Sequence, residues 1–225
     1  MDRLAGHGGV AWWREQALEV VHQERLERKG RNTDMNSKLV DRWLGGTIYC
    51  IASGPSLTLA DCEKVRLTGH PVIVANNTWE MCPWSDILMA CDAKWWRQYG
   101  AAVRVGFSGI CLSYDRYPDV LSLCRESWFR HFANTGADTI SLSVLAGASK
   151  VILLGFDCQE SGGKKHWHED HPSALESPIG MHRWSAIFAK VAVYAEEYGT
   201  QVINCSRQTA LECFERGHLE EFLDH

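Results

Sequence analysis

The segment Lys164–His171 concentrates side chains that can do chemistry. It consists of Lys-Lys-His-Trp-His-Glu-Asp-His, so that three histidines and two acids fall within six residues. Histidine exchanges a proton near neutral pH, because its reference pKa is about 6.5, and its ring nitrogens are also common metal ligands. The run can therefore serve proton transfer or metal binding, and His166 and His168 are the candidate catalytic residues.

The histidine run has two alternatives to a role in proton transfer. Its pattern, H-x-H-x-D-H, resembles the dizinc motif of metallo-β-lactamase-like hydrolases. Those enzymes carry the motif early in the chain, after β-hairpins, and use further ligands downstream, whereas here it follows the fifth strand of an alternating strand and helix pattern. A zinc-dependent hydrolase is thus the less favoured alternative. A solvated surface loop is the second alternative.

A turn that contains glycine is the second candidate for chemistry. Ser53, Gly54, Pro55 and Ser56 stand between an apolar run and a helix expected to begin near Thr58. Glycine lets a ligand approach the backbone closely, and free amides near a helix start favour phosphate. The motif is neither a Walker loop nor a G-x-G-x-x-G loop. We predict that these four residues bind a nucleotide, with an ordinary turn as the alternative.

Two further polar segments are candidates for nucleotide binding. Asn76 and Asn77 follow the second apolar run, and their side-chain amides suit hydrogen bonds to a base, a ribose or a phosphate. Asn134, Thr135 and Gly136 begin a predicted helix, whose free amides favour a phosphate or a nucleobase. The alternatives are an Asx turn for the first pair and a simple helix cap for the second segment.

Two aspartates, Asp92 and Asp157, each follow a predicted strand. Carboxylate oxygens are preferred ligands of Mg²⁺, so both residues are candidates to hold this ion on a diphosphate. Asp157 is also a candidate nucleotide contact through a ribose hydroxyl. Capping of a neighbouring helix is the alternative for either residue.

Six short apolar runs alternate with segments of helical pattern. Continuous apolar runs of this length are typical of strands that are buried on both faces, as in a parallel sheet. The runs span 47–52, 71–75, 86–91, 109–113, 150–154 and 201–204, and helices are predicted over 11–29, 134–148 and 182–198. The alternation predicts a Rossmann-like, doubly wound α/β fold with a mainly parallel sheet of about six strands.

This fold would bring the candidate residues together. In an open parallel sheet, ligands bind beyond the carboxyl ends of the strands. The glycine turn, the asparagine pair, Asp92 and Asp157 follow the first, second, third and fifth predicted strands, and the histidine run comes shortly after Asp157. We therefore expect these distant segments to meet at one edge of the sheet.

Composition limits the class of protein. Of the 225 residues 45% are hydrophobic, which is enough for a sizeable core, and we predict an N-terminal helix and lead-in over 1–46 and one nucleotide-binding domain over 47–225. The net charge of −5 gives no nucleic-acid signature, and no stretch approaches the ~20 apolar residues of a membrane span. Nine scattered cysteines without a Cys-x-x-Cys pair favour the reducing cytoplasm. The oligomeric state is left open, a homo-oligomer included.

Taken in order, these segments resemble a known superfamily. Residues 51–57, Ile-Ala-Ser-Gly-Pro-Ser-Leu, are similar to the G-x-G-P-S-L loop of bacterial lipooligosaccharide sialyltransferases and of MptE-like hydroxymethylpterin diphosphokinases. Residues 74–77 look like the asparagine segment after their second strand. Residues 134–157 look like their T-S-G helix, the next strand and its G-x-D ending. His166-Trp167 looks like the H-Y pair of the sialyltransferase loop that carries the general base.

The resemblance implies a Rossmann-like fold in which residues already singled out surround a nucleotide. These are Gly54, Pro55, Ser56, Asn76, Asn77, Thr135 and Gly136. The chain departs from the sialyltransferases at Ser53, where they have Asn, and at its Asn-Thr-Gly helix start. The tail over 202–223 also resembles MptE-like proteins found in phage genomes, in which case the protein would act in the host cytoplasm.

The leading hypothesis is a nucleotide-dependent transferase with a histidine general base. It would move a glycosyl or a diphosphoryl group from a nucleotide or nucleotide-sugar donor to a small-molecule hydroxyl acceptor, and the diphosphoryl branch would require Mg²⁺. A non-catalytic nucleotide-binding accessory protein of a phage is the alternative from a different class. The zinc-dependent hydrolase comes third.

Overall fold

The computed structural model describes residues 43–118, 120–123, 129–168 and 180–223. The helix predicted over 11–29 and nearly all of the lead-in lie outside these residues. So do Glu169, Asp170 and His171 at the end of the histidine run.

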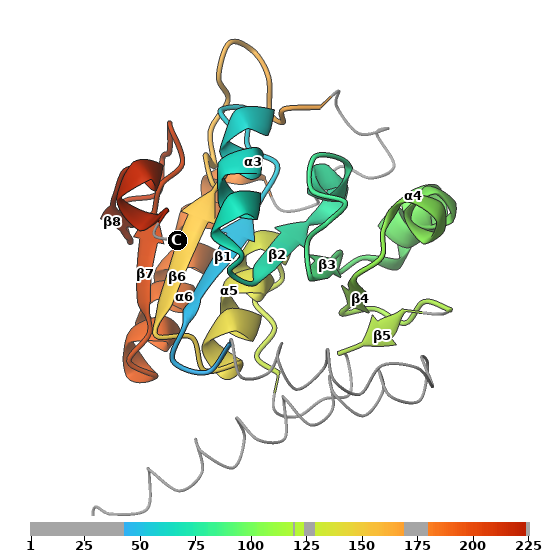
Figure 1. Cartoon of the computed structure of the whole chain (residues 1–225), viewed down its shortest axis with the longest axis horizontal. Coiled ribbons are helices and arrows are strands. Elements are labelled where there is room, and N and C mark those ends of the chain that lie inside the picture. The colour runs from blue at the N-terminus through green and yellow to red at the C-terminus, as the bar shows by residue number, and fades with distance from the viewer. Residues whose placement is uncertain (1–42, 119, 124–128, 169–179, 224–225) are drawn as a thin grey trace, which may run out of the picture.

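An eight-stranded sheet, parallel throughout, forms the centre of the described chain (Figure 1). Its order is β5-β4-β3-β2-β1-β6-β7-β8. The strands are β1 (Thr47–Ile51), β2 (Val72–Ala75), β3 (Ile87–Met89), β4 (Ile110–Ser113), β5 (Leu121–Ser122), β6 (Lys150–Leu154), β7 (Gln201–Asn204) and β8 (Glu215–Arg216). The predicted α/β class and all six predicted strands are confirmed, and the two-residue strands β5 and β8 at the sheet edges are additional.

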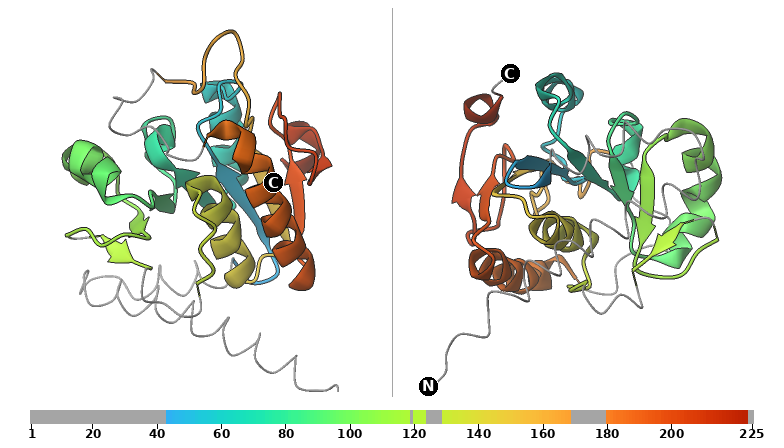
Figure 2. Two further views of the ribbon diagram at one scale, coloured as in Figure 1. Left: turned by 180° about the vertical axis from the view of Figure 1, so that it is seen from behind. Right: turned by 60° about the horizontal axis from the view of Figure 1, so that its bottom comes forward.

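Helices cover both faces of the sheet. One face carries α3 (Leu59–Thr68), α4 (Ala93–Gly106) and the short 3₁₀ helix η4 (Leu219–Phe222), and the other carries α5 (Thr135–Leu145) and α6 (Trp184–Glu197). Two more 3₁₀ helices, η1 (Asn76–Glu80) and η3 (Met181–Arg183), follow β2 and precede α6. Figure 1 shows α3 in front of the sheet, and the views in Figure 2 show α5 and α6 on the opposite side.

The strand residues explain this layering. Successive side chains of a strand point to opposite faces. In β1, Ile48 and Cys50 accordingly pack into the hydrophobic cluster with α5 and α6, while Tyr49 and Ile51 pack into the cluster with α3 and α4. All four are fully buried. A continuous apolar run is therefore what this strand requires.

Polar side chains cap the start of α3, which follows the glycine turn, and the start of α5, which precedes β6. Thr58 Oγ1 accepts the Asp61 amide at 3.2 Å and caps α3. Asn134 Oδ1 accepts the Ala137 amide at 3.1 Å and caps α5, as the sequence predicts. Each cap satisfies an amide that the first turn leaves without a helical partner.

The strand order creates a crevice beside β1. From β1 the chain builds β2 to β5 on one side, and then returns to place β6 on the other side of β1. The connections after β1 and β6 therefore leave the sheet in different directions. Such a topological switch point, beyond the carboxyl ends of the strands, is where open parallel sheets bind ligands.

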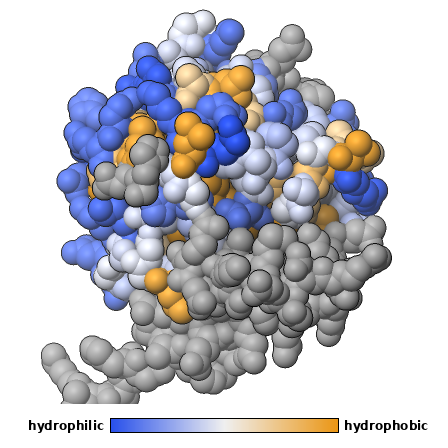
Figure 3. Space-filling view, viewed as in Figure 1, coloured by the Kyte–Doolittle hydropathy of each residue, from blue (hydrophilic) through white to orange (hydrophobic). Residues whose placement is uncertain are grey.

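The surface of the described residues carries scattered large apolar side chains. On the face in Figure 3 apolar residues form separate groups among hydrophilic ones. The exposed large apolar residues of the described chain are Leu44, Leu59, Leu67, Val105 and Val193. Single exposed apolar residues are ordinary on globular proteins. In the described part of the chain, no helix has the length and apolar character to cross a lipid bilayer.

Candidate functional site

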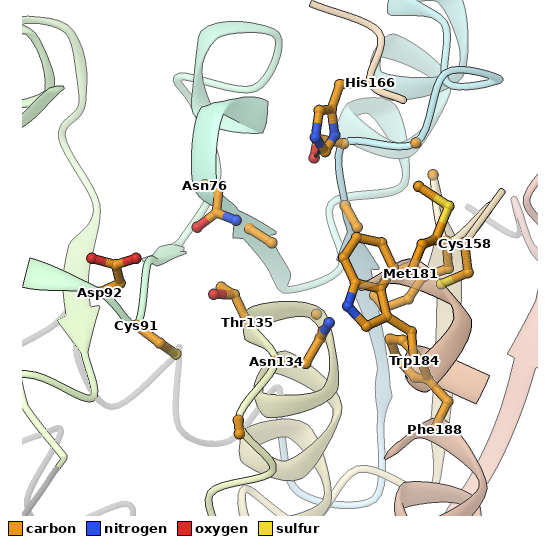
Figure 4. Close-up of a pocket in the computed structure, with 18 of the residues that line it drawn as sticks. Asn76, Cys91, Asp92, Asn134, Thr135, Cys158, His166, Met181, Trp184 and Phe188 are labelled. Atoms are coloured by element: carbon orange, nitrogen blue, oxygen red, sulfur yellow. Dashed lines mark hydrogen bonds between the residues drawn. The ribbon is translucent and has the colours of Figure 1, made fainter. Parts of the chain in front are cut away.

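A cavity of about 610 Å³ opens beyond the carboxyl ends of β1, β2, β3, β4 and β6. The residues that follow these strands line it, together with the start of α5, the loop before α5, and Met181, Trp184 and Phe188 around η3 and α6. Figure 4 shows side chains from these elements around one common space. The cavity includes the switch point between β1 and β6.

Eight of the sequence-predicted site residues line this cavity. They are Ser53, Gly54, Asn76, Asp92, Asn134, Thr135, Gly136 and His166. The other five predicted residues, Pro55, Ser56, Asn77, Asp157 and His168, are not among its lining residues. The segments thus meet as the fold prediction requires. Within a segment, however, some residues line the cavity and others contact the surrounding protein.

Asp157 supports the glycine turn from beneath. Its carboxylate accepts the Ser56 amide at 2.8 Å and the Ser56 hydroxyl at 2.9 Å. A Cβ atom on Gly54 would stand 2.2 Å from Asp157 Oδ1 and 2.5 Å from the Gly155 carbonyl oxygen, so that only glycine fits. Burial raises the pKa of Asp157, although the hydrogen bonds from Ser56 act in the opposite direction. Asp157 and Ser56 therefore hold the turn against β6.

The two asparagines of the second segment have different positions. Asn76 lines the cavity, while the buried Asn77 turns into the protein. Asn77 Oδ1 accepts the indole N–H of Trp95 at 2.8 Å, and Asn77 Nδ2 donates to Glu80 at 3.1 Å. Asn77 thus links η1 to α4, and only Asn76 presents its amide to the cavity (Figure 4).

The start of α5 points its first residues at the cavity. Asn134, Thr135 and Gly136 all line it (Figure 4 labels the first two). A Cβ atom on Gly136 would meet Phe156 at 3.1 Å, so the small residue lets β6 and α5 approach closely. The first turn of a helix carries amides without helical partners and a partial positive charge, and both favour an anion.

Backbone strain is concentrated around this cavity. Among the described residues, the non-glycine residues with positive φ are Asn76 (50°), Ala133 (58°) and Cys158 (50°). All three line the cavity, although they belong to three segments that are far apart in the sequence. Side chains other than glycine rarely adopt this left-handed conformation, which costs of order 1–3 kcal/mol at each residue, and such strain clusters at functional sites.

His166 lies at the cavity and His168 does not line it. His166 Nδ1 lies 3.2 Å from Ser53 Oγ, within hydrogen-bond distance, and the Trp167 amide donates to the Ser53 carbonyl oxygen at 3.1 Å. The His168 ring stacks on the His166 ring with their centroids 4.9 Å apart. These contacts anchor the histidine loop to the glycine turn and present one imidazole to the cavity.

Asp92 caps the next helix. Its Oδ1 accepts the amides of Lys94 at 2.7 Å and of Trp95 at 3.3 Å at the start of α4. Asp92 lines the cavity and Asp157 does not, so these two carboxylates do not face the same space. The residues predicted for Mg²⁺ therefore do not form a joint ion site.

The sequence prediction missed three residues that meet beside the cavity, two of which, Cys91 and His131, line it. His131 Nδ1 lies 2.8 Å from Asp138 Oδ2, and Cys91 Sγ donates to the same oxygen at 3.1 Å. The His131 ring stacks on Tyr114 with 3.6 Å between centroids. Burial is the main cause that raises the pKa of the Cys91 thiol well above its usual value, and the negative charge of Asp138 is the second cause. Because these residues come from separate segments, no local pattern in the sequence indicates their meeting.

Comparison with known proteins gives a structural match. No family model matches the sequence, and no curated protein matches it. The fold is similar to that of the sialyltransferase CstII from Campylobacter jejuni, whose structure is a complex with a substrate analogue, cytidine-5'-monophosphate. The match covers 76% of this chain and 84% of that chain, with 12% sequence identity and a TM-score of 0.53. The two chains share a fold. The Rossmann-like α/β class is thereby confirmed.

Proposed function

We propose that this protein is a transferase that binds a nucleotide-activated donor in the cavity and passes a glycosyl group to a hydroxyl acceptor. The observation that carries this proposal is the convergence at the switch point. There the Gly54 turn, the start of α5 and the His166 loop line one cavity of about 610 Å³. Cavities of about 300–1,000 Å³ are usual for small-molecule ligands.

The lining suits the separate parts of such a donor. Amides at the start of α5 favour the phosphate, and the Lys165 side chain in the lining adds a positive charge. The amides of Gly54, Ser56 and Leu57 are held by Gly155, Asp157 and Gly54 itself, so the turn shapes the cavity wall. Met181, Trp184 and Phe188 supply an apolar wall that suits a base or sugar ring. When the donor bond breaks, negative charge grows on the leaving nucleotide, and fixed amide dipoles would stabilise it.

His166 would remove the proton from the acceptor hydroxyl. Its contact with Ser53 orients the ring beside the turn that holds the donor, so that base and leaving group belong to one site. A general base of this kind typically contributes about 10²–10⁴-fold in rate. His168 stacks on His166 and would limit the rotation of its ring.

The glycosyl branch is favoured over the diphosphoryl branch by two observations. Asp157 is engaged by Ser56 rather than facing the cavity, so the predicted pair of carboxylates for Mg²⁺ is not assembled. The fold is shared with a sialyltransferase that was studied with cytidine-5'-monophosphate. A requirement for Mg²⁺ in turnover, lost on chelation and restored by that ion, would instead support the diphosphoryl branch.

Nucleotide binding is tested first, by thermal unfolding with CMP, UMP, ADP, GDP and their sugar conjugates. A ligand at 100 times its Kd stabilises the fold by about 2.7 kcal/mol, which corresponds to a rise in Tm of roughly 5–10 °C for a chain of this size. The matched variant is Asn134→Asp, which keeps a capping oxygen and adds a negative charge at the cavity. This variant should unfold like the wild type without ligand and lose the shift. No shift with any of these compounds would overturn the proposal.

Catalysis is tested separately through His166→Ala. With a donor that produces a shift, and a panel of hydroxyl acceptors, we expect the variant to bind the donor normally and to lose about 10²–10⁴-fold in turnover. Donor binding without any turnover in the wild type would favour the non-catalytic accessory protein. Turnover that is unaffected by the substitution would contradict the assigned base.

A further inference from the structure

Three side chains from separate segments converge on one point beside the cavity. Cys91 follows β3, His131 precedes α5, and Asp138 lies in the first turn of α5. The sulfur of Cys91 and a ring nitrogen of His131 both contact the same oxygen, Asp138 Oδ2, at 3.1 and 2.8 Å. One ligand atom from each residue lies within 4.8 Å of the other two.

The chemistry of these three groups matches that of a zinc ligand set. Thiolate, imidazole and carboxylate bind Zn²⁺ at about 2.0–2.3 Å, which places neighbouring ligands of a tetrahedral site about 3.4–3.6 Å apart. The observed separations from Asp138 Oδ2, 2.8 and 3.1 Å, are shorter by about half an ångström. A small outward movement of the His131 and Cys91 side chains would therefore make room for the ion in place of the shared hydrogen bonds.

Burial of charge also favours a cation here. Asp138 has no solvent exposure, and its partners in the described chain are a thiol, an imidazole that carries a charge only when protonated, and a backbone amide. A buried carboxylate is costly unless a positive charge compensates it. One Zn²⁺ ion bound by one thiolate and one carboxylate gives a site with no net charge.

The surroundings hold the ligands in place. The Phe132 amide donates to Asp138 Oδ1 at 2.7 Å, which leaves Oδ2 for the cluster, and Tyr114 stacks on the His131 ring. Such outer contacts orient metal ligands. Cys91 and His131 both line the cavity, so a fourth coordination position would face its interior. Three protein ligands with one open position are the arrangement of catalytic zinc sites.

We propose that Cys91, His131 and Asp138 form a Zn²⁺ site whose open position faces the cavity. None of its three ligands belongs to the histidine run at 166–171, to which the sequence pattern assigned a zinc alternative. It requires no nucleotide, so its test is independent of the proposed transfer reaction. An oxygen atom of a bound ligand or a water molecule would take the fourth position.

The test is anaerobic titration of the metal-free full-length protein with Co²⁺, followed by displacement with Zn²⁺. We expect one equivalent of Co²⁺, a thiolate-to-cobalt charge-transfer absorption, and loss of that absorption when Zn²⁺ is added. Cys91→Ser should abolish the charge-transfer absorption. His131→Gln, at a side chain that is 24% exposed, should weaken metal affinity at least about tenfold and leave the fold intact by circular dichroism.

Two matched controls separate this site from its neighbours. Cys158→Ser changes another cysteine that lines the same cavity, and His168→Ala changes the histidine run. Both should bind Co²⁺ with the wild-type spectrum and stoichiometry. The proposal is overturned if the wild type binds no metal, if binding survives both Cys91→Ser and His131→Gln, or if His168→Ala removes it.

Discussion

At the scale of single residues, the candidate site depends on contacts that leave no room for substitution. Gly54 lies against Asp157 and the Gly155 carbonyl, and Asp157 in turn holds Ser56 by two hydrogen bonds. The Gly54 amide also donates to the Gly155 carbonyl oxygen, so the amides of this turn hold its shape, and they do so against residues that follow a different strand. A ligand at this turn would depend on the packing of β1 against β6.

The substitution Gly54→Ala tests this dependence. The added methyl group must displace Asp157 or the Gly155 carbonyl, so we expect a loss of about 1–3 kcal/mol in the free energy of unfolding and loss of any nucleotide-dependent thermal shift. Urea denaturation measures the first effect. The control is Gly162→Ala, where φ is +57° and no atom lies within 4 Å of the added Cβ. It should cost about 1–2 kcal/mol from backbone strain and leave ligand binding unchanged.

Single residues also show where sequence-based prediction reached its limit. The sequence marks Asn76 and Asn77 equally, but the turn into η1 directs one to the cavity and the other to Trp95. Likewise, Asp157 follows a strand as predicted, and its carboxylate faces the glycine turn instead of the cavity. Chain position locates a residue at the correct edge of the sheet, but side-chain direction depends on tertiary contacts.

At the scale of elements, long apolar strands and capped helices were predictable and short edge strands were not. Each of the six predicted strands carries an apolar run, because both of its faces are covered. β8 consists of the exposed residues Glu215 and Arg216, so its sequence has no strand pattern. The cluster of Cys91, His131 and Asp138 joins β3 to the start of α5, a contact that depends on the packing of α5 across the sheet.

An ion pair anchors the first turn of α3 to the segment after β7. Arg207 donates to both oxygens of Asp61, at 2.9 and 2.8 Å. Burial alone would raise the pKa of Asp61, but the hydrogen bonds from Arg207 and Thr58 outweigh it and lower the pKa below its ordinary value of 3.8. The pair therefore stabilises the fold fully above pH 4, and this contribution is lost as the pH falls through the folded-state pKa.

Arg207→Ala should accordingly lower Tm at pH 7, and the difference from the wild type should shrink as the pH falls below about 4. Thermal unfolding followed by circular dichroism between pH 3 and pH 7 measures this. Arg66→Ala is the control, since its ion pair with Glu63 is about half exposed, and exposed pairs contribute little. A difference that grows on acidification would contradict the assigned role of Asp61.

At the scale of the whole molecule, the sheet divides the core into two hydrophobic clusters. Ile140 of α5 belongs to one cluster and Val65 of α3 to the other, and both side chains are fully buried. The doubly wound arrangement was predictable because strands and helices alternate along the chain. The position of the switch point beside β1 follows from the strand order, and the sequence alone leaves that order open.

This division predicts that core substitutions on opposite faces act independently. Ile140→Ala should cost about 2–5 kcal/mol and Val65→Ala about 1–3 kcal/mol, and the double variant should lose their sum within about 0.5 kcal/mol. Urea denaturation of the three proteins gives these values. As a comparison, Ile140→Ala with Val144→Ala removes neighbours on one helix and should deviate from the sum. Equal deviations in both pairs would show that the sheet transmits strain between its faces.

The left-handed residues Asn76, Ala133 and Cys158 have a consequence for selection in the laboratory. Glycine at any of these positions would relax the backbone. A screen for heat-resistant variants should therefore recover glycine there early, before it recovers changes elsewhere in the chain. In the variants that survive heating best, the segments that line the cavity would then be less rigid. A gain in heat tolerance would therefore be accompanied by a loss of ligand binding.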